Sequence, residues 1–73
     1  MSSLVTQAFV FERYGARLST ADLAEIMKIG TGTIRNQLSA GTFPIKTYVD
    51  GGQRWAAYQD VADHLDSLHA QAA

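Results

Sequence analysis

The absence of cysteine is the feature that most limits what this chain can fold into. Without a disulfide or a zinc–thiolate site, a hydrophobic core must hold its 73 residues together unaided. A chain of this size buries only about 60% of the surface that its unfolded form exposes, so that core is thin. We therefore expect one small domain, with too little interior for a catalytic pocket, and a binding module before an enzyme.

The composition is that of a globular chain, with 47% hydrophobic and 18% charged residues. No apolar run approaches the roughly 20 residues that a membrane span needs. The first residues also lack the basic flank and long apolar stretch of a signal peptide. A cytoplasmic protein with no membrane partner is expected.

Capping and turn signals divide the chain into four expected helices and one β-hairpin. Ser19 followed by Asp22 forms a capping box for a helix that ends near Lys28, and Gly41 is a typical left-handed end for the next helix. Asp50-Gly51-Gly52 predicts a tight turn because it supplies positive φ angles. The expected helices cover residues 4–14, about 20–28, 31–40 and 58–69, and the expected strands cover 45–49 and 53–57.

Two helices joined by a short glycine-containing turn form a helix-turn-helix, and a hairpin that follows it is a wing. The expected fold is therefore mainly α with a small β-hairpin. Residues 18–73 would form a winged helix-turn-helix, and residues 1–17 would add an N-terminal helix, capped by Ser3 and stopped by Gly15.

The added helix has an apolar stripe of Leu4, Ala8 and Phe11, broadened by Val5 and Phe9. Such a face must pack on the rest of the domain or on another chain. Both alternatives stay open, so the stripe is a candidate oligomerisation surface.

The net charge of −1 hides an uneven distribution. Residues 26–59 sum to +3, whereas residues 1–25 sum to −1 and residues 60–73 sum to −3. Because local potential governs binding to polyanions more than total charge does, a basic middle region permits nucleic-acid binding.

In the helix expected at 31–40, Ile34 and Leu38 belong to the core, which leaves a polar face of Gly32, Arg35, Asn36 and Ser39. Small residues allow close approach to a surface, and arginine and asparagine suit bidentate contacts with guanine and adenine edges. The helix start at Gly30-Thr31-Gly32 offers N–H groups and a hydroxyl to a phosphate. The alternative is an ordinary polar surface.

The hairpin adds Arg54 just after the glycine turn and Lys46 on the partner strand. We expect Trp55 to pin the hairpin to the thin core rather than to stack on a base. Tyr48 suits either packing or a phosphate contact.

Four segments follow a spaced pattern, namely Leu18–Ile29, Thr33–Arg35, Ser39–Pro44 and Gly51–Trp55. The pattern resembles the excisionase-type, MerR-like winged-helix DNA-binding family, whose members have a small-Gly-x-hydrophobic-Pro step and a Gly-x-Arg-Trp wing. The likeness covers residues 18–68. Three features depart from it: Gly30 replaces a capping serine, Thr31 and Gly32 replace frequent arginine or lysine, and the N-terminal helix is additional.

The resemblance implies a transcription regulator, or an excisionase that directs a recombinase, of a phage or plasmid. By position it assigns DNA contacts to Thr31, Thr33, Arg35, Asn36 and Arg54. Together with the basic and polar residues above, the expected DNA-binding set is Lys28, Thr31, Gly32, Thr33, Arg35, Asn36, Ser39, Lys46 and Arg54.

So few cations neutralise about three phosphates, which predicts weak binding by one copy and favours a homodimer or cooperative oligomer on DNA. The expected partners are duplex DNA, a second copy, and a recombinase or polymerase. The alternative function is a protein-interaction module that keeps the fold and binds a phage or host protein. No cofactor, metal site or catalytic residue is expected, because His64 and His69 have the wrong spacing for one metal ion.

Overall fold

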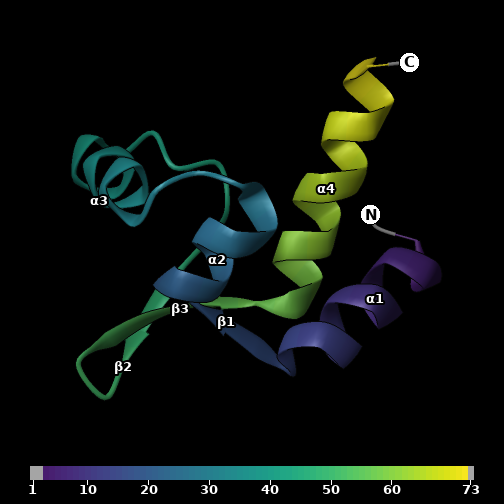
Figure 1. The fold of residues 1–73 in the computed structure, drawn as a ribbon, viewed down its shortest axis with the longest axis horizontal. Helices are drawn as coiled ribbons and strands as arrows, with labels where there is room; N and C mark the ends of the chain where they lie inside the picture. The colour runs from purple at the N-terminus through teal and green to yellow at the C-terminus, as the bar shows by residue number, and fades with distance from the viewer. Residues whose placement is uncertain (1–2, 73) are drawn as a thin grey trace.

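Four helices and a three-stranded antiparallel sheet make up the structure, a computed structural model that describes residues 3–72 (Figure 1). Of the two segments expected from the sequence, 1–17 loses residues 1 and 2 and 18–73 loses residue 73, because these residues lie outside the described part. In chain order the elements are α1 (Leu4–Tyr14), β1 (Arg17–Ser19), α2 (Thr20–Met27), α3 (Thr31–Ala40), β2 (Tyr48–Asp50), β3 (Gln53–Ala57) and α4 (Tyr58–Ala72).

The helix ends confirm the capping signals. Ser19 and Asp22 exchange side-chain to backbone hydrogen bonds, each 3.2 Å long, at the start of α2. Lys28 adopts a left-handed conformation at the end of α2, with φ of 58°, and Gly41 does so at the end of α3, with φ of 73°. Only the last helix is longer than expected, since α4 continues past His69.

The sheet has one strand more than expected, in the order β1-β3-β2. The expected hairpin is present as β2 and β3, and the third strand was missed because only the long-range pairing of Leu18 with Ala56 sets β1 alongside β3. The three residues of β1 are too few to show an alternating hydrophobic pattern, so β1 forms only through this long-range pairing. β2 also begins at Tyr48 rather than at Ile45, which is buried in the core instead.

The hydrophobic core collects residues from nearly every element. Leu18 of β1, Leu23 of α2 and Ile34 of α3 are fully buried. The complete set of buried apolar residues is Val10, Leu18, Leu23, Ile34, Ile45, Ala56, Val61 and Ala62. Since no single element holds more than two of them, the core depends on the four helices, β1 and β3 packing together.

The N-terminal helix packs within this same core, mainly through residues that the sequence did not single out. Val10 is fully buried, and the hydroxyl of Thr6 donates a hydrogen bond of 2.7 Å to Asp66 of α4. The Phe11 ring meets the Tyr58 ring edge-on, with the centroids 5.1 Å apart. Leu4, Ala8 and Phe11 nevertheless remain exposed, so α1 is joined to the domain and also presents an apolar face outward.

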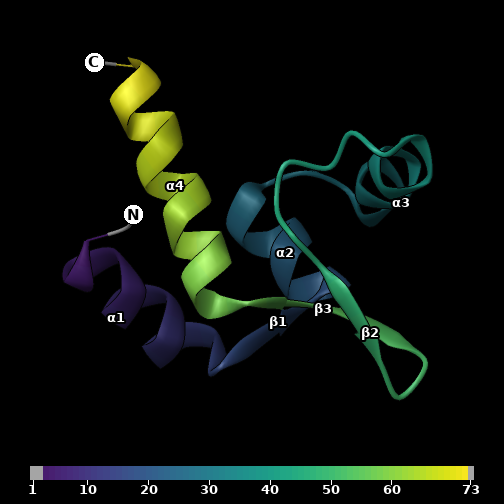
Figure 2. The same cartoon turned by 180° about the vertical axis from the view of Figure 1, so that it is seen from behind.

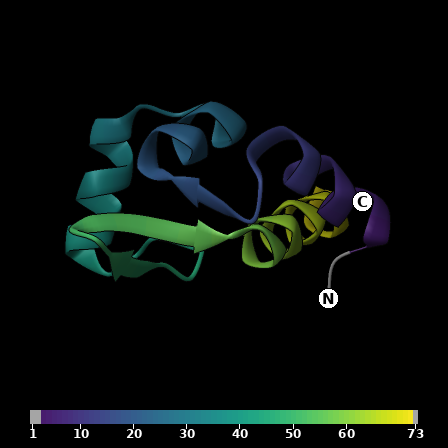
Figure 3. The same ribbon diagram turned by 90° about the horizontal axis from the view of Figure 1, so that it is seen from below.

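The elements fall into two ends of the molecule. Figures 1 and 2 show α3 and the turn of the β2–β3 hairpin at one end and α1 beside α4 at the other, with α2 between them. Seen from below, α3 lies beside the hairpin at one end of the molecule, and α1 and α4 lie together at the opposite end (Figure 3). None of the helices in the described part is both long and apolar enough to cross a bilayer.

Candidate nucleic-acid interface

Helix α3 is held to the domain by one side and leaves the other open. Ile34 is fully buried and Leu38 is half-buried, four residues apart on the inner side. Gly32, Arg35, Asn36 and Ser39 are exposed, as is Thr33, whereas Thr31 at the first position is half-buried. Within the part of the chain that the structure describes, the side chains of Arg35 and Asn36 have no hydrogen bond or ion pair, so both are available to a ligand.

A shallow depression of about 380 Å³ joins α3 to the hairpin, and its lining is Arg35, Leu38, Ser39 and Arg54. The two arginines come from elements almost twenty residues apart and face the same hollow. Arg54 is held in place by Thr47, whose hydroxyl oxygen accepts a hydrogen bond of 2.9 Å from the guanidinium Nη1. The fold thus brings two exposed cations onto one surface beside the polar face of α3.

A second depression continues this surface towards the start of α2. It has a volume of about 340 Å³ and is lined by Ser19, Thr20, Ala21, Gln53 and Arg54. Thr20 and Gln53 were not among the expected site residues; Gln53 directly precedes Arg54 in β3, and the pairing of β1 with β3 brings Thr20 beside them. The first-turn N–H groups of α2 are partly satisfied by the capping box, so the hydroxyl, amide and guanidinium groups are the main polar features here.

The other expected basic residues lie apart from these depressions. Lys28 lines a separate hollow of about 290 Å³ between α1, α2 and α4, which it shares with Glu25 and Arg13. A hydrogen bond from Arg13 holds the pKa of Glu25 below its ordinary value, and the charge of Lys28 adds to this effect. Lys46 is exposed in the segment that connects α3 to β2. Lys28, expected in the DNA-binding set, lines neither of the two depressions beside Arg54.

The opposite face of the sheet carries a cluster of Arg17, Trp55 and Asp50. The Arg17 guanidinium lies 3.8 Å from the centre of the Trp55 ring and pairs with the Asp50 carboxylate at 2.7 Å. That hydrogen bond to Asp50 raises the pKa of Arg17. The Trp55 indole N–H donates to the backbone carbonyl of Asp50 at 3.1 Å.

The expectation that Trp55 pins the hairpin to the core was therefore wrong. Trp55 pairs with Ser19 and Tyr48 on the face of the sheet that points away from Leu18 and Ala56. Alternation along β3 puts Ala56 inward and Trp55 outward. The indole braces the hairpin from outside, and Tyr48 beside it is also exposed.

Acidic side chains are concentrated away from the α3 surface. Asp60, Asp63 and Asp66 belong to α4, which lies beside α1 and not beside α3 (Figure 1), and Asp50 is paired with Arg17. Among residues 3–72, there is no group of three or more His, Cys, Asp or Glu side chains that could hold a metal ion. The arrangement favours the binding of an anionic ligand at the α3 end.

No protein-family model, curated protein or solved structure matches this chain.

Proposed function

We propose that this chain binds duplex DNA through α3 and the β2–β3 hairpin. The observation that supports it best is the shared depression, in which Arg35 and Ser39 of α3 meet Arg54 of β3. A surface with two exposed arginines and no acidic lining residue among those described favours a polyanion.

In this proposal α3 enters the major groove, which is about 12 Å wide and admits one helix. Gly32 and Ser39 are small and exposed, so the helix backbone can approach the base edges closely. Asn36 and Arg35 have the side chains suited to bidentate contacts with adenine and guanine. Their lack of partners within residues 3–72 is consistent with this role.

The hairpin would hold the neighbouring backbone as a wing. Arg54 projects on the same face of β3 as Ala56, towards α3, and its hydrogen bond to Thr47 limits its rotamers. A cation fixed in this way contacts a phosphate with less loss of side-chain entropy. Lys46, exposed just before the hairpin, would supply a further phosphate contact.

The task we propose is control of transcription or of site-specific recombination in a phage or plasmid, which follows the resemblance to excisionase-type, MerR-like domains. Binding would place the protein on the nucleoid, with a recombinase or polymerase as a further partner. The role is binding without catalysis.

A second candidate function is a protein-interaction module, favoured by the apolar residues that α1 leaves exposed. That face lies at the end of the molecule away from α3 (Figure 1), so it does not compete with DNA for the same surface. The two functions separate by salt dependence, because only the phosphate contacts release counterions.

The test is binding of the chain to a mixed pool of duplex DNA at about 50 and about 200 mM salt, where the two phosphate contacts of Lys46 and Arg54 predict a roughly 12-fold loss of affinity. Arg54→Gln should weaken binding and flatten this dependence. Arg13→Gln is the matched control, because it removes the same charge from α1, where Arg13 pairs with Glu25. Affinity that does not change with salt, or equal effects of the two variants, would refute the proposal and favour the interaction module.

Selection of bound sequences from a random pool would then define the target. A recovered site should contain guanine or adenine at the positions read by Arg35 and Asn36, and the Arg35→Gln variant should lose its preference at one position. Each such contact is worth about 1–3 kcal/mol of discrimination.

A further inference from the structure

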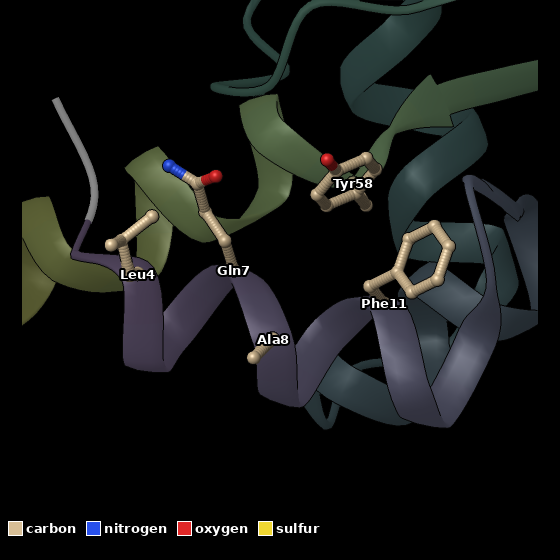
Figure 4. Close-up of a pocket in the computed structure, with 5 residues that line it drawn as sticks. All are labelled: Leu4, Gln7, Ala8, Phe11 and Tyr58. Atoms are coloured by element: carbon tan, nitrogen blue, oxygen red, sulfur yellow. The ribbon is translucent and has the colours of Figure 1, made fainter.

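The exposed side of α1 is the largest group of apolar side chains that the fold leaves uncovered. Leu4 and Val5 are 82% and 81% exposed, and Phe9 and Phe11 are 56% and 49% exposed. Helical spacing sets Leu4 and Val5 on the side of α1 away from the buried Val10, with Phe9 and Phe11 at the two edges of that side. The depression beside them, about 270 Å³, is lined by Leu4, Gln7, Ala8, Phe11 and Tyr58 (Figure 4).

The uncovered apolar surface of α1 is close to the upper limit of what a monomer exposes in one patch. Four large apolar side chains at these exposures leave on the order of 500 Å², near the top of the range of about 300–600 Å² for the largest patch on a typical monomer. Two such patches together would bury about 1,000 Å², which is the lower limit for a specific interface. We therefore expect the association to be weak and reversible.

We propose that a second copy of this chain docks on this face, with the two α1 helices antiparallel across a two-fold axis near Ala8. Along the helix a small residue, Ala8, lies between two large ones, Leu4 and Phe11 (Figure 4). In an antiparallel pair, Leu4 of each copy approaches Phe11 of the other while the two Ala8 residues meet at the centre. A two-fold interface requires this kind of self-complementarity.

The charges of α1 favour the same orientation. The first turn of α1 contains no acidic residue, and Glu12 is exposed near its other end. An antiparallel arrangement keeps the two Glu12 carboxylates at opposite ends of the interface, whereas a parallel arrangement would set them side by side, where they repel. Arg13 does not oppose this arrangement because it is paired with Glu25 at 3.0 Å.

No charged side chain lines the depression among the described residues, so nothing there selects a charged partner. Self-association through α1 is also independent of DNA binding, since α3 and the hairpin turn lie at the other end of the molecule (Figures 1 and 2). A dimer of this kind would leave both α3 surfaces free.

Sedimentation velocity of the DNA-free chain from about 5 to about 500 μM tests the proposal, because interfaces of this size dissociate at such concentrations. The wild-type chain should shift from monomer to dimer, and Ala8→Glu should remain monomeric. Ala8 is exposed and lies outside the core, so circular dichroism should show unchanged helix content for this variant. The control is Leu68→Glu on α4, whose side chain is 48% exposed and does not line the depression, and it should dimerise like the wild type.

A second measurement uses the absence of cysteine from the native chain. Oxidised Ala8→Cys should give a disulfide-linked dimer in high yield, because the two copies meet near this residue, whereas Leu68→Cys should give little. A wild-type chain that stays monomeric at the highest concentration would overturn the proposal, as would equal cross-linking of the two cysteine variants. Growth beyond a dimer would overturn the two-fold arrangement.

Discussion

Arg17 and Asp50 form an ion pair that crosses the central strand of the sheet, with Nη1 of Arg17 2.7 Å from Oδ2 of Asp50. Arg17 belongs to β1 and Asp50 to β2, the two edge strands, and the Trp55 ring of β3 lies beneath the guanidinium. One side chain thus links all three strands. The hairpin is braced at its turn by a residue more than thirty positions earlier in the chain.

We predict that Arg17→Gln loosens the hairpin, because it removes both the ion pair and the cation that covers Trp55. Trp55 is the only tryptophan, so its fluorescence emission should shift to longer wavelength. Amide hydrogens of β2 should also exchange faster. Arg13→Gln, which removes the Arg13–Glu25 ion pair, should leave the emission unchanged. Identical emission from all three proteins would show that Arg17 does not brace the hairpin.

Thr47→Val should lower the affinity for duplex DNA while keeping the slope of its salt dependence. The substitution removes the acceptor that holds Arg54, so the guanidinium must be ordered on binding. Ordering one long side chain costs about 0.5–1.5 kcal/mol, or about two- to tenfold in affinity. Arg54→Gln is the comparison, since it should reduce the slope as well. A flattened slope for Thr47→Val would contradict a purely positioning role.

Lys28→Gly should stabilise the fold, because Lys28 ends α2 with φ of 58°, which glycine adopts without strain. The left-handed conformation costs a non-glycine residue about 1–2 kcal/mol. Glycine avoids this cost, but it also makes the unfolded chain more flexible, and that flexibility cancels part of the gain in stability. We expect a gain of about 1 kcal/mol in denaturant unfolding, and none for Lys28→Ala. Both variants should bind DNA like the wild type, and a loss equal to that of Arg35→Gln would place Lys28 in the interface.

Gly41→Ala and Gly32→Ala form a matched pair within α3 and its cap. An added Cβ meets nothing within 4 Å at either position, but only Gly41 has a positive φ, at 73°. Gly41→Ala should therefore destabilise the fold by about 1 kcal/mol, and Gly32→Ala should stabilise it by up to about 1 kcal/mol. Thermal unfolding checks both signs. Destabilisation by both substitutions would mean that the ends of α3 lack the space for an added Cβ that the structure shows.

Acid should release the N-terminal end of α1 from α4. The backbone N–H of Ser3 and the hydroxyl of Thr6 donate to Asp66, and these bonds hold the pKa of Asp66 below its ordinary value of 3.8. A lowered folded pKa contributes stability above the ordinary value, and this contribution is lost as the pH falls through the folded pKa.

The measurement is the thermal midpoint of wild type and Asp66→Asn between about pH 2 and 6, the range that brackets the titration of carboxylates. The wild type should be the more stable above the ordinary pKa, and the difference should shrink below it. Asp63→Asn, an exposed neighbour on α4, should show no such trend. A difference that does not vary with pH would show that Asp66 contributes no pH-dependent stability.

The helix ends and the turn could be predicted from the sequence because each depends on groups within a few residues of one another. The Ser19–Asp22 capping box, the left-handed Gly41 and the Asp50-Gly51-Gly52 turn all occur where expected. The inner side of α3 was predictable for the same reason, since the spacing of Ile34 and Leu38 sets one face of a helix.

Long-range contacts decided the rest. β1 has no signal of its own and forms only because β3 supplies its hydrogen bonds, and the same pairing turns Trp55 outward. α1 is apolar on several sides, so periodicity could not show that Val10 would be buried while Leu4 and Phe11 stayed exposed.

The sequence by itself determined the helices, their caps and the hairpin turn, since local hydrogen bonds and backbone preferences fix them. Only the tertiary structure set Arg35 beside Arg54 and moved Lys28 away from both, because the packing of a shared core decides which helix faces meet.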